Sequence, residues 1–148
     1  MLENYEITII GRQTIDHETG EIKVETLGDY VEKRGIKYIS YMEYDNDAPY
    51  AGRHKILKIE PDGVVTMFTP GTPTRLVLEK GKRHMCMYDT GAGLLSLGVF
   101  TKTLKQDLSP EGGEIRIGYT LDINSNLSSH NEILVQLKKR ETSETSEN

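Results

Sequence analysis

Hydrophobic and polar residues alternate along most of this chain, so that every second position carries a side chain of the same kind. Groups of Gly, Pro, Asn and Asp interrupt the alternation at intervals of about ten residues, which is typical of a sandwich or barrel. The apolar repeat of an amphipathic helix does not persist in any window of roughly 11 to 18 residues. The pattern predicts β-strands at residues 3–15, 21–33, 36–45, 53–60, 63–69, 74–80, 82–89, 94–106, 114–124 and 131–139.

The predicted strands are joined by short connections that contain turn-forming residues. These connections are Asp16 to Gly20, Arg34-Gly35, Pro61-Asp62-Gly63, Pro70 to Pro73, Gly81, Gly91 to Gly93 and Gly112-Gly113. Short connections favour pairing between consecutive strands, and a meander of this length exposes two edges unless it closes on itself. We therefore expect an all-β fold, a single closed antiparallel up-and-down barrel of about eight to ten strands.

The first two hairpins predict a register. With Arg34-Gly35 as a two-residue loop, Tyr30 lies opposite Ile39 and Gly28 lies opposite Tyr41. A glycine opposite Tyr41 would leave room for the aromatic ring across its strand. The register places five residues on one face of the strand: Ile22, Val24, Thr26, Gly28 and Tyr30.

Further strand faces follow from the same alternation. Keeping Ile39 and Tyr41 on the inner face in the next hairpin pairs Ile39 with Ile59, Tyr41 with Leu57, and Glu43 with Lys55. In the strand at 82–89, either Met85 and Met87 or His84, Cys86 and Tyr88 face inward, and the pattern leaves this open. In the strands near 94–106 and 114–124 we expect the odd-numbered face to be buried, namely Leu95, Leu97, Val99, Ile115, Ile117, Tyr119 and Leu121.

Length and composition indicate one domain, at residues 1–140, followed by a disordered tail at 141–148. The chain has 148 residues, which is close to the commonest size of a single domain, and its last eight residues include none that is apolar. The single cysteine, Cys86, cannot form an internal disulfide, and the first ten residues resemble no leader sequence. These features favour a cytoplasmic protein that is not inserted in a membrane.

The net charge of −5 disfavours nonspecific binding to nucleic acid, because the field of the whole protein repels a polyanion. The eight tyrosines, with no tryptophan, are consistent either with ordinary strand faces or with an interior that has polar tips. A homodimer is left open by the composition.

Strand-face patterns over most of the chain resemble those of a known family. The stretches that carry the resemblance are Tyr38 to Glu43, Lys55 to Ile59, Tyr88 to Gly93 leading into Leu95, Leu97 and Val99, Thr101 to Thr103, and Ile115 to Tyr119. They resemble the YwiB-like proteins, small bacterial proteins with a domain of unknown function, over roughly residues 5–138. The resemblance implies a calycin-like, lipocalin-type barrel and no particular chemistry. Relatives tend to carry an arginine before the glycine after the fifth strand, whereas this chain has Phe68-Thr69-Pro70-Gly71.

Two motifs suggest chemistry. Asp89-Thr90-Gly91-Ala92 matches the short string around the catalytic aspartate of aspartic proteases, but a single copy would need a homodimer to supply the second aspartate. A hairpin turn accounts for these residues more simply, with the Asp89 carboxylate bonded to nearby backbone amides. Glu43 and Lys55 would form either a polar pair that orients a ligand inside the barrel or an ordinary cross-strand ion pair at its rim.

Metal binding is not predicted. His84 and Cys86 share a strand face, but no third ligand stands at zinc spacing. Asp45-Asn46-Asp47 begins like a calcium loop, yet Tyr50 and Ile56 occupy the positions that need glycine and glutamate. We expect no cofactor and identify no catalytic residue.

These observations favour noncatalytic binding of a small, partly apolar molecule inside the barrel. The alternatives are a filled barrel that serves as a protein-interaction or structural module, or an enzyme of unassigned class. The candidate ligand-binding residues are Tyr41, Glu43, Lys55, Tyr88, Thr101 and Tyr119.

Overall fold

The computed structural model describes residues 3–45, 48–89 and 91–141 of the chain, and in them every regular element is a strand. The strands are β1 (Tyr5–Ile15), β2 (Glu18–Lys33), β3 (Ile36–Asp45), β4 (Ala48–Ile59), β5 (Val65–Phe68), β6 (Arg75–Leu78), β7 (Arg83–Asp89), β8 (Leu94–Ser109), β9 (Gly112–Ile123) and β10 (Asn126–Lys139). Each overlaps a predicted strand, although β2, β4 and β10 begin earlier than the alternation predicts. The described residues contain no helix that is long and apolar enough to cross a membrane.

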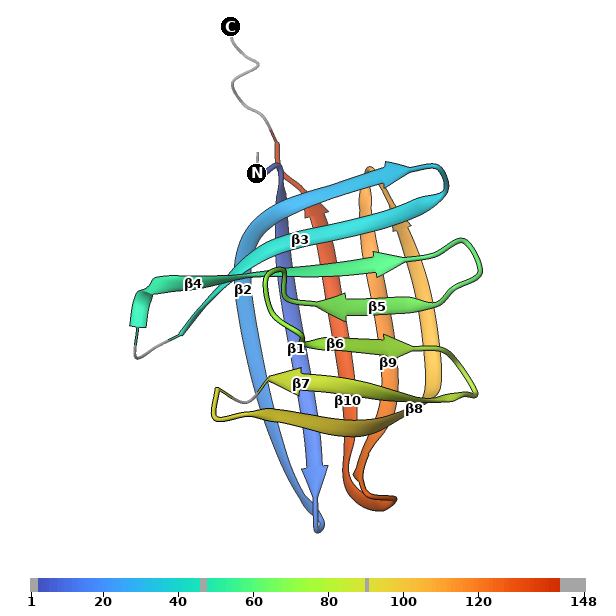
Figure 1. Cartoon of the computed structure of the whole chain (residues 1–148). Helices are drawn as coiled ribbons and strands as arrows, with labels where there is room; N and C mark the ends of the chain where they lie inside the picture. The colour runs from blue at the N-terminus through green and yellow to red at the C-terminus, as the bar shows by residue number, and fades with distance from the viewer. Residues whose placement is uncertain (1–2, 46–47, 90, 142–148) are drawn as a thin grey trace, which may run out of the picture.

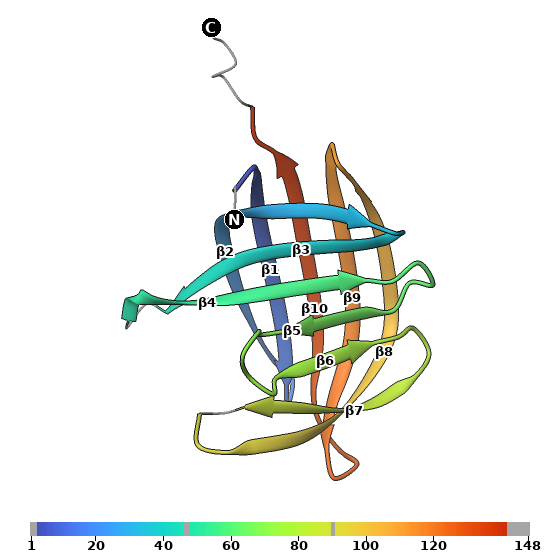
Figure 2. The same cartoon turned by 45° about the horizontal axis from the view of Figure 1, so that its top comes forward.

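The ten strands close into one antiparallel barrel in which each strand pairs with its neighbours in sequence and β1 pairs with β10. The predicted up-and-down barrel is therefore confirmed. Figures 1 and 2 show that β1, β9 and β10 run across the direction of β3 to β7, so that two layers of strands face each other. The long strands β2 and β8 curve and contribute to both layers.

Gly28 lies where β2 passes from one layer to the other. It is paired with Tyr5 of β1 and with Tyr41 of β3, so both ladders meet at this residue. A Cβ atom here would collide with the carbonyl oxygen of Ser40 and would lie 2.6 Å from Cδ1 of Ile7. The predicted position of Gly28 opposite Tyr41 is thus confirmed, but the atoms that exclude a side chain here belong to Ser40 and Ile7 and not to the ring of Tyr41.

The register of the first hairpin is confirmed, whereas that of the second is wrong by two residues. Tyr30 lies opposite Ile39 as predicted. Between β3 and β4, however, Ile39 pairs with Leu57 and Tyr41 pairs with Lys55. The hairpin turn comes earlier along the chain than the alternation suggests, since β4 begins at Ala48. A shift of two positions keeps every side chain on its predicted face, because side chains alternate with a period of two.

The predicted loops at 16–20 and 125–130 are mostly strand. The β1–β2 turn consists of Asp16 and His17, and the β9–β10 turn consists of Asn124 and Ser125, all with positive φ angles. Both turns suit a tight hairpin, which matches the twist of the flanking strands. The residues next to them are mostly polar and show no apolar alternation, because here the strands extend past the packed core and need only their backbone ladders.

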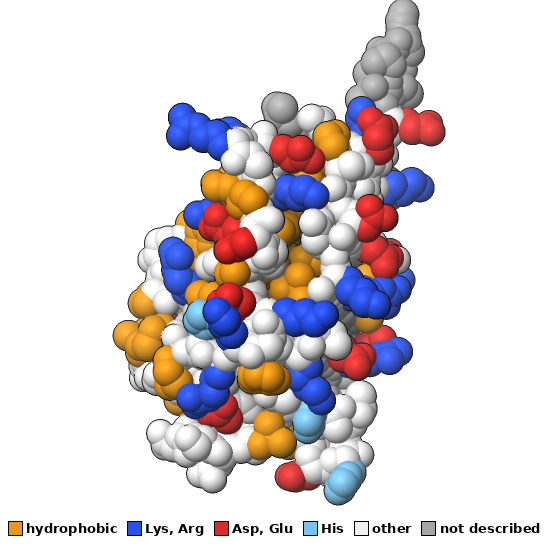
Figure 3. All heavy atoms as spheres, turned by 90° about the vertical axis from the view of Figure 1, so that its right-hand side faces the viewer, with side chains coloured by type: hydrophobic (Ala, Val, Ile, Leu, Met, Phe, Trp, Pro, Cys, Tyr) orange, Lys and Arg blue, Asp and Glu red, His pale blue; other side chains and the backbone are white. Residues whose placement is uncertain are grey.

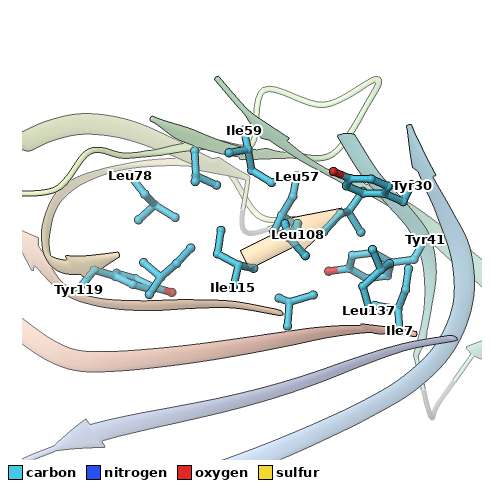
Figure 4. Close-up of a cluster of buried hydrophobic side chains, with 14 of the residues drawn as sticks. Ile7, Tyr30, Tyr41, Leu57, Ile59, Leu78, Leu108, Ile115, Tyr119 and Leu137 are labelled. Carbon is cyan, nitrogen blue, oxygen red and sulfur yellow. The ribbon is translucent and has the colours of Figure 1, made fainter. Parts of the chain in front are cut away.

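The barrel interior is filled over most of its length by aliphatic side chains and tyrosines from both layers (Figure 4). The predicted buried face of β8 and β9 is confirmed: Leu97, Val99, Ile115, Ile117 and Tyr119 are buried, and Leu95 and Leu121 pack partly buried against them. The open question about β7 is also decided. Cys86 faces inward and is buried, whereas Met85 and Met87 are exposed.

The side of the barrel that carries the β2–β3, β4–β5 and β6–β7 turns shows Lys and Arg interspersed with Asp and Glu (Figure 3). The charges form no large area of a single sign on this face. The predicted tail at 141–148 lies outside the described residues apart from Glu141.

Candidate functional site

In an up-and-down barrel the turns that follow odd-numbered strands all lie at one end, which we call the open end. Side chains deep in the barrel are almost completely buried, as Ile39 and Ile115 show with no exposed surface. Toward the open end the inner face becomes accessible, and Ile22 of β2 is 63% exposed. Ile22 was predicted on the apolar face, and its exposure follows from its position beyond the packed core.

One wall of the open end holds what we call the Lys55 pocket, two cavities that share Lys55, Thr69, Thr74 and Tyr88 as lining residues. The inner cavity measures about 170 Å3 and is also lined by Tyr41, Leu57, Met67 and Leu76. The outer cavity measures about 380 Å3 and extends to Arg53, the β5–β6 turn and Asp89. A polar entrance thus leads to an apolar interior.

The ammonium group of Lys55 is the central charge of this pocket. Its Nζ donates a hydrogen bond of 3.1 Å to Oγ1 of Thr69 and lies 3.9 Å from Oε1 of Glu43. The separation from Glu43 permits an ion pair but is longer than a hydrogen bond. Burial, together with the negative charge of Glu43, raises the pKa of the Tyr41 hydroxyl, which therefore stays protonated at neutral pH.

A second wall, formed by β1, β2, β9 and β10, holds a cavity of about 820 Å3, which we call the Tyr119 cavity. A row of inward residues runs from strand to strand, and its members from Tyr119 to Gly20 line the cavity. The row runs from Thr101 to Tyr119, Asn131, Gln13 and Gly20, each directly opposite the next in the ladders. Apolar side chains stand beside the row at Ile15, Ile22 and Ile133.

The amides in this row are held in place by one another. Nε2 of Gln13 donates to Oδ1 of Asn131 at 3.1 Å, and Nδ2 of Asn131 donates to Oγ of Ser129 at 2.9 Å. Gly20 ends the row with open space above it, since a Cβ atom there would meet nothing within 4 Å. Burial raises the pKa of the Tyr119 hydroxyl to about 12, so this group is a neutral hydrogen-bonding partner at physiological pH.

The six candidate residues are therefore divided between two walls. Tyr41, Lys55 and Tyr88 line the Lys55 pocket, while Tyr119 lines the second cavity. In Figure 4, Tyr41 and Tyr119 lie toward opposite sides of the buried cluster.

The other two candidates line neither cavity. Glu43 borders the Lys55 pocket through its ion pair with Lys55, so the predicted proximity of these two residues is confirmed. They are diagonal neighbours, because Glu43 lies directly opposite Arg53. Thr101 is completely buried, and its hydroxyl has no hydrogen-bond partner among the residues that the structure describes.

Gln13, Asn131 and Gly20 were not identified from the sequence. The sequence pattern predicts Gly20 in a loop and Asn131 at the first position of a strand. The available signal was the pair Ser129 and Asn131, two polar residues two positions apart that share a face with the apolar residues Ile133 and Val135.

Asp89 forms the predicted turn. Its Oδ1 accepts a hydrogen bond of 2.9 Å from the backbone N–H of Gly91, and its own N–H donates to Oγ1 of Thr74. Within the described ranges, no group of three His, Cys, Asp or Glu residues is arranged to hold a metal ion. His84 instead contacts Oε1 of Glu79 at 2.9 Å. The Asp45-Asn46-Asp47 motif lies partly outside the described residues.

Comparison with known proteins agrees with this architecture. A family model described as "Domain of unknown function (DUF1934)" matches residues 7–135. The crystal structure of the ywiB protein from Bacillus subtilis superposes with a TM-score of 0.80 at 20% sequence identity, covering 93% of this chain and 92% of the other. At that identity the likeness concerns the fold. No curated protein matches the chain.

Proposed function

The chain belongs to the DUF1934 family, a domain of unknown function, and we propose from the geometry of its barrel that it binds a small, partly apolar molecule at the open end without transforming it. The observation that carries the proposal is the contrast between the packed interior and the cavities of the open end. The Tyr119 cavity, at about 820 Å3, has the size and the mixture of apolar and polar lining that small-molecule sites have.

The chemistry of the two walls supports binding more than catalysis. The row of Tyr119, Asn131 and Gln13 offers neutral donors and acceptors, and Lys55 offers one positive charge above an apolar interior. The net charge of −5 supports a small-molecule partner over a nucleic acid. We also propose that the protein works in the cytoplasm.

The proposal can be tested with a neutral fluorescent dye and variants that fill each cavity. N-phenyl-1-naphthylamine is titrated against the wild type, Gly20→Phe and Leu76→Phe. Gly20 faces the open space of the Tyr119 cavity, and Leu76 lines the Lys55 pocket. We expect the wild type to bind the dye and at least one filled variant to bind it much more weakly.

Two matched controls place the same phenylalanine outside the barrel. Lys23→Phe lies on the outer face of β2 and Arg75→Phe on the outer face of β6, at positions where the native side chains are exposed. Both controls should bind the dye as the wild type does. Binding that is equal in the wild type and in both filled variants would contradict the proposal.

The alternative of a protein-interaction module is favoured by one observation. Met85 and Leu94, on the outer face of the β7–β8 hairpin, are 59% and 55% exposed, and Met87 beside them is 39% exposed. Flexible methionine side chains suit surfaces that contact proteins. If the dye does not bind and native mass spectrometry finds no copurified small molecule, a protein-interaction module explains the barrel better than ligand binding does.

A further inference from the structure

The Lys55 pocket is built around an amine whose hydrogen-bonding capacity is only partly used. An ammonium group has three donors. Within the part of the chain that the structure describes, Nζ of Lys55 makes one hydrogen bond, to Thr69, and its nearest carboxylate oxygen, on Glu43, is 3.9 Å away. The Lys55 side chain is only 26% exposed, so bulk water does not freely surround it. Its other N–H groups make no hydrogen bond to the described residues, and we assign them to the ligand.

The charges around this amine favour an anion. Arg53 lies two residues nearer the β3–β4 turn on the same face as Lys55 and also lines the outer cavity, so two cations face the entrance. Glu43 stands beside Lys55 but lines neither cavity. The carboxylate of Asp89 is engaged by the N–H of Gly91. The entrance therefore carries charges of both signs, and Lys55 is the charged residue that lines both the outer and the inner cavity.

The inner end of the pocket requires a different chemistry. Beyond Lys55 the cavity of about 170 Å3 is walled by Leu57, Met67 and Leu76 together with the ring of Tyr41. An apolar group would fill this space, and a charged one would lose its hydration without a partner. The pocket thus joins one anion-binding donor to one apolar chamber.

We infer that the Lys55 pocket binds a small apolar monocarboxylate, with the carboxylate on Lys55 and the hydrocarbon part among Leu57, Met67 and Leu76. This inference rests on the proposed function and names the class of its ligand. The carboxylate accepts hydrogen bonds from the other N–H groups of Nζ and enters the pocket past Arg53. The negative charge of Glu43 weakens this binding, because two carboxylates that share one ammonium group repel each other.

The test uses three probes that share a phenyl group on a short alkyl chain and carry an anionic, a neutral or a cationic polar end: 4-phenylbutyrate, 4-phenylbutyramide and 4-phenylbutylamine. Binding is measured by calorimetry to the wild type, Lys55→Met, Glu43→Gln and the control Lys58→Met. Lys58 lies on the outer face of the same strand, paired with Glu60 at 3.2 Å, so the control loses the same charge outside the pocket.

We expect the wild type to bind the carboxylate about tenfold or more tightly than the amide, since a hydrogen bond to a charged group is stronger than its neutral counterpart. Lys55→Met should abolish this preference, while Glu43→Gln should increase it. Lys58→Met should leave it unchanged. The amine should bind most weakly to the wild type. Circular dichroism checks that each variant is folded. Glu43→Gln tests the inference even if Lys55→Met does not fold.

The outcomes separate the two proposals. Equal affinities for carboxylate and amide, unaffected by Lys55→Met and Glu43→Gln, would overturn the carboxylate inference and leave small-molecule binding standing. Tightest binding of the amine would also overturn it. Failure of all three probes, together with failure of the neutral dye, would overturn the proposed function itself.

Discussion

The guanidinium group of Arg83 and the carboxylate of Asp122 meet through two hydrogen bonds on the outer face of the barrel, over Gly98. Nε of Arg83 donates to Oδ2 at 2.9 Å and Nη2 donates to Oδ1 at 2.6 Å. A Cβ atom on residue 98 would lie 2.5 Å from Oδ1 of Asp122 and would collide with the guanidinium group. The contact ties β7 to β9 across β8, so the absence of a side chain at Gly98 allows three strands to be joined.

Asp122→Asn should lower stability near neutral pH and have a smaller effect in acid. The hydrogen bonds from Arg83 hold the pKa of Asp122 below its ordinary value of 3.8. A depressed pKa stabilises the fold above the pKa of the unfolded chain, and this contribution is lost as the pH falls through the folded pKa. Thermal melts at pH 7 and near pH 3 measure the difference. A difference between wild type and variant that is equal at both pH values would contradict the expectation.

Ile117→Ala should destabilise the barrel by about 2–5 kcal/mol, as truncation of a buried aliphatic side chain usually does. Ile117 of β9 is 2% exposed and lies in the core cluster. Urea unfolding followed by circular dichroism gives the free energy. Arg116→Ala on the outer face of the same strand is the control and should cost much less. An unchanged unfolding midpoint for Ile117→Ala would refute its burial.

Asp89→Asn should leave the fold and its thermal stability nearly unchanged, because asparagine keeps a side-chain oxygen that can accept the N–H of Gly91. Asp89→Ala removes that acceptor and should lower the melting temperature more. Neither variant should lose peptide cleavage at about pH 4 to 6, since we expect no such activity in the wild type. Cleavage by the wild type that disappears in folded Asp89→Asn would restore the protease interpretation.

Tyr119→Phe should reduce the loss of stability in alkali. The pKa of Tyr119 is raised by burial to about 12, so the folded protein keeps this proton over a range where the unfolded chain releases it. Stability therefore falls as the pH rises above 10, by on the order of 2 kcal/mol once the pH reaches 12. Urea midpoints at pH 8 and pH 11 compare the two proteins. Tyr88→Phe, at an exposed tyrosine, is the control and should follow the wild type.

The strand pattern and the first hairpin were accessible from sequence because their causes are local. Alternation assigns each side chain to a face, and Arg34-Gly35 sets the register of Tyr30 against Ile39 through the geometry of a two-residue turn. The same reasoning placed Ile117 and Val99 in the core. Glu43 and Lys55 were brought together correctly, although the hairpin between them has a different register.

The alternation alone determined the fold class, the strand order and the inward face of most strands, since these depend only on period two and on short turns. The tertiary structure decided which inward residues are buried and which line a cavity. Ile22 and Ile39 are both apolar and inward, yet one is exposed at the open end and the other is buried. The row from Thr101 to Gly20 exists only because the barrel closes: the pairing of β1 with β10 joins β8, β9 and β10 at one end of the chain to β1 and β2 at the other. Burial and cavity volume depend on all strands at once, and no local pattern encodes how far each strand extends beyond the core.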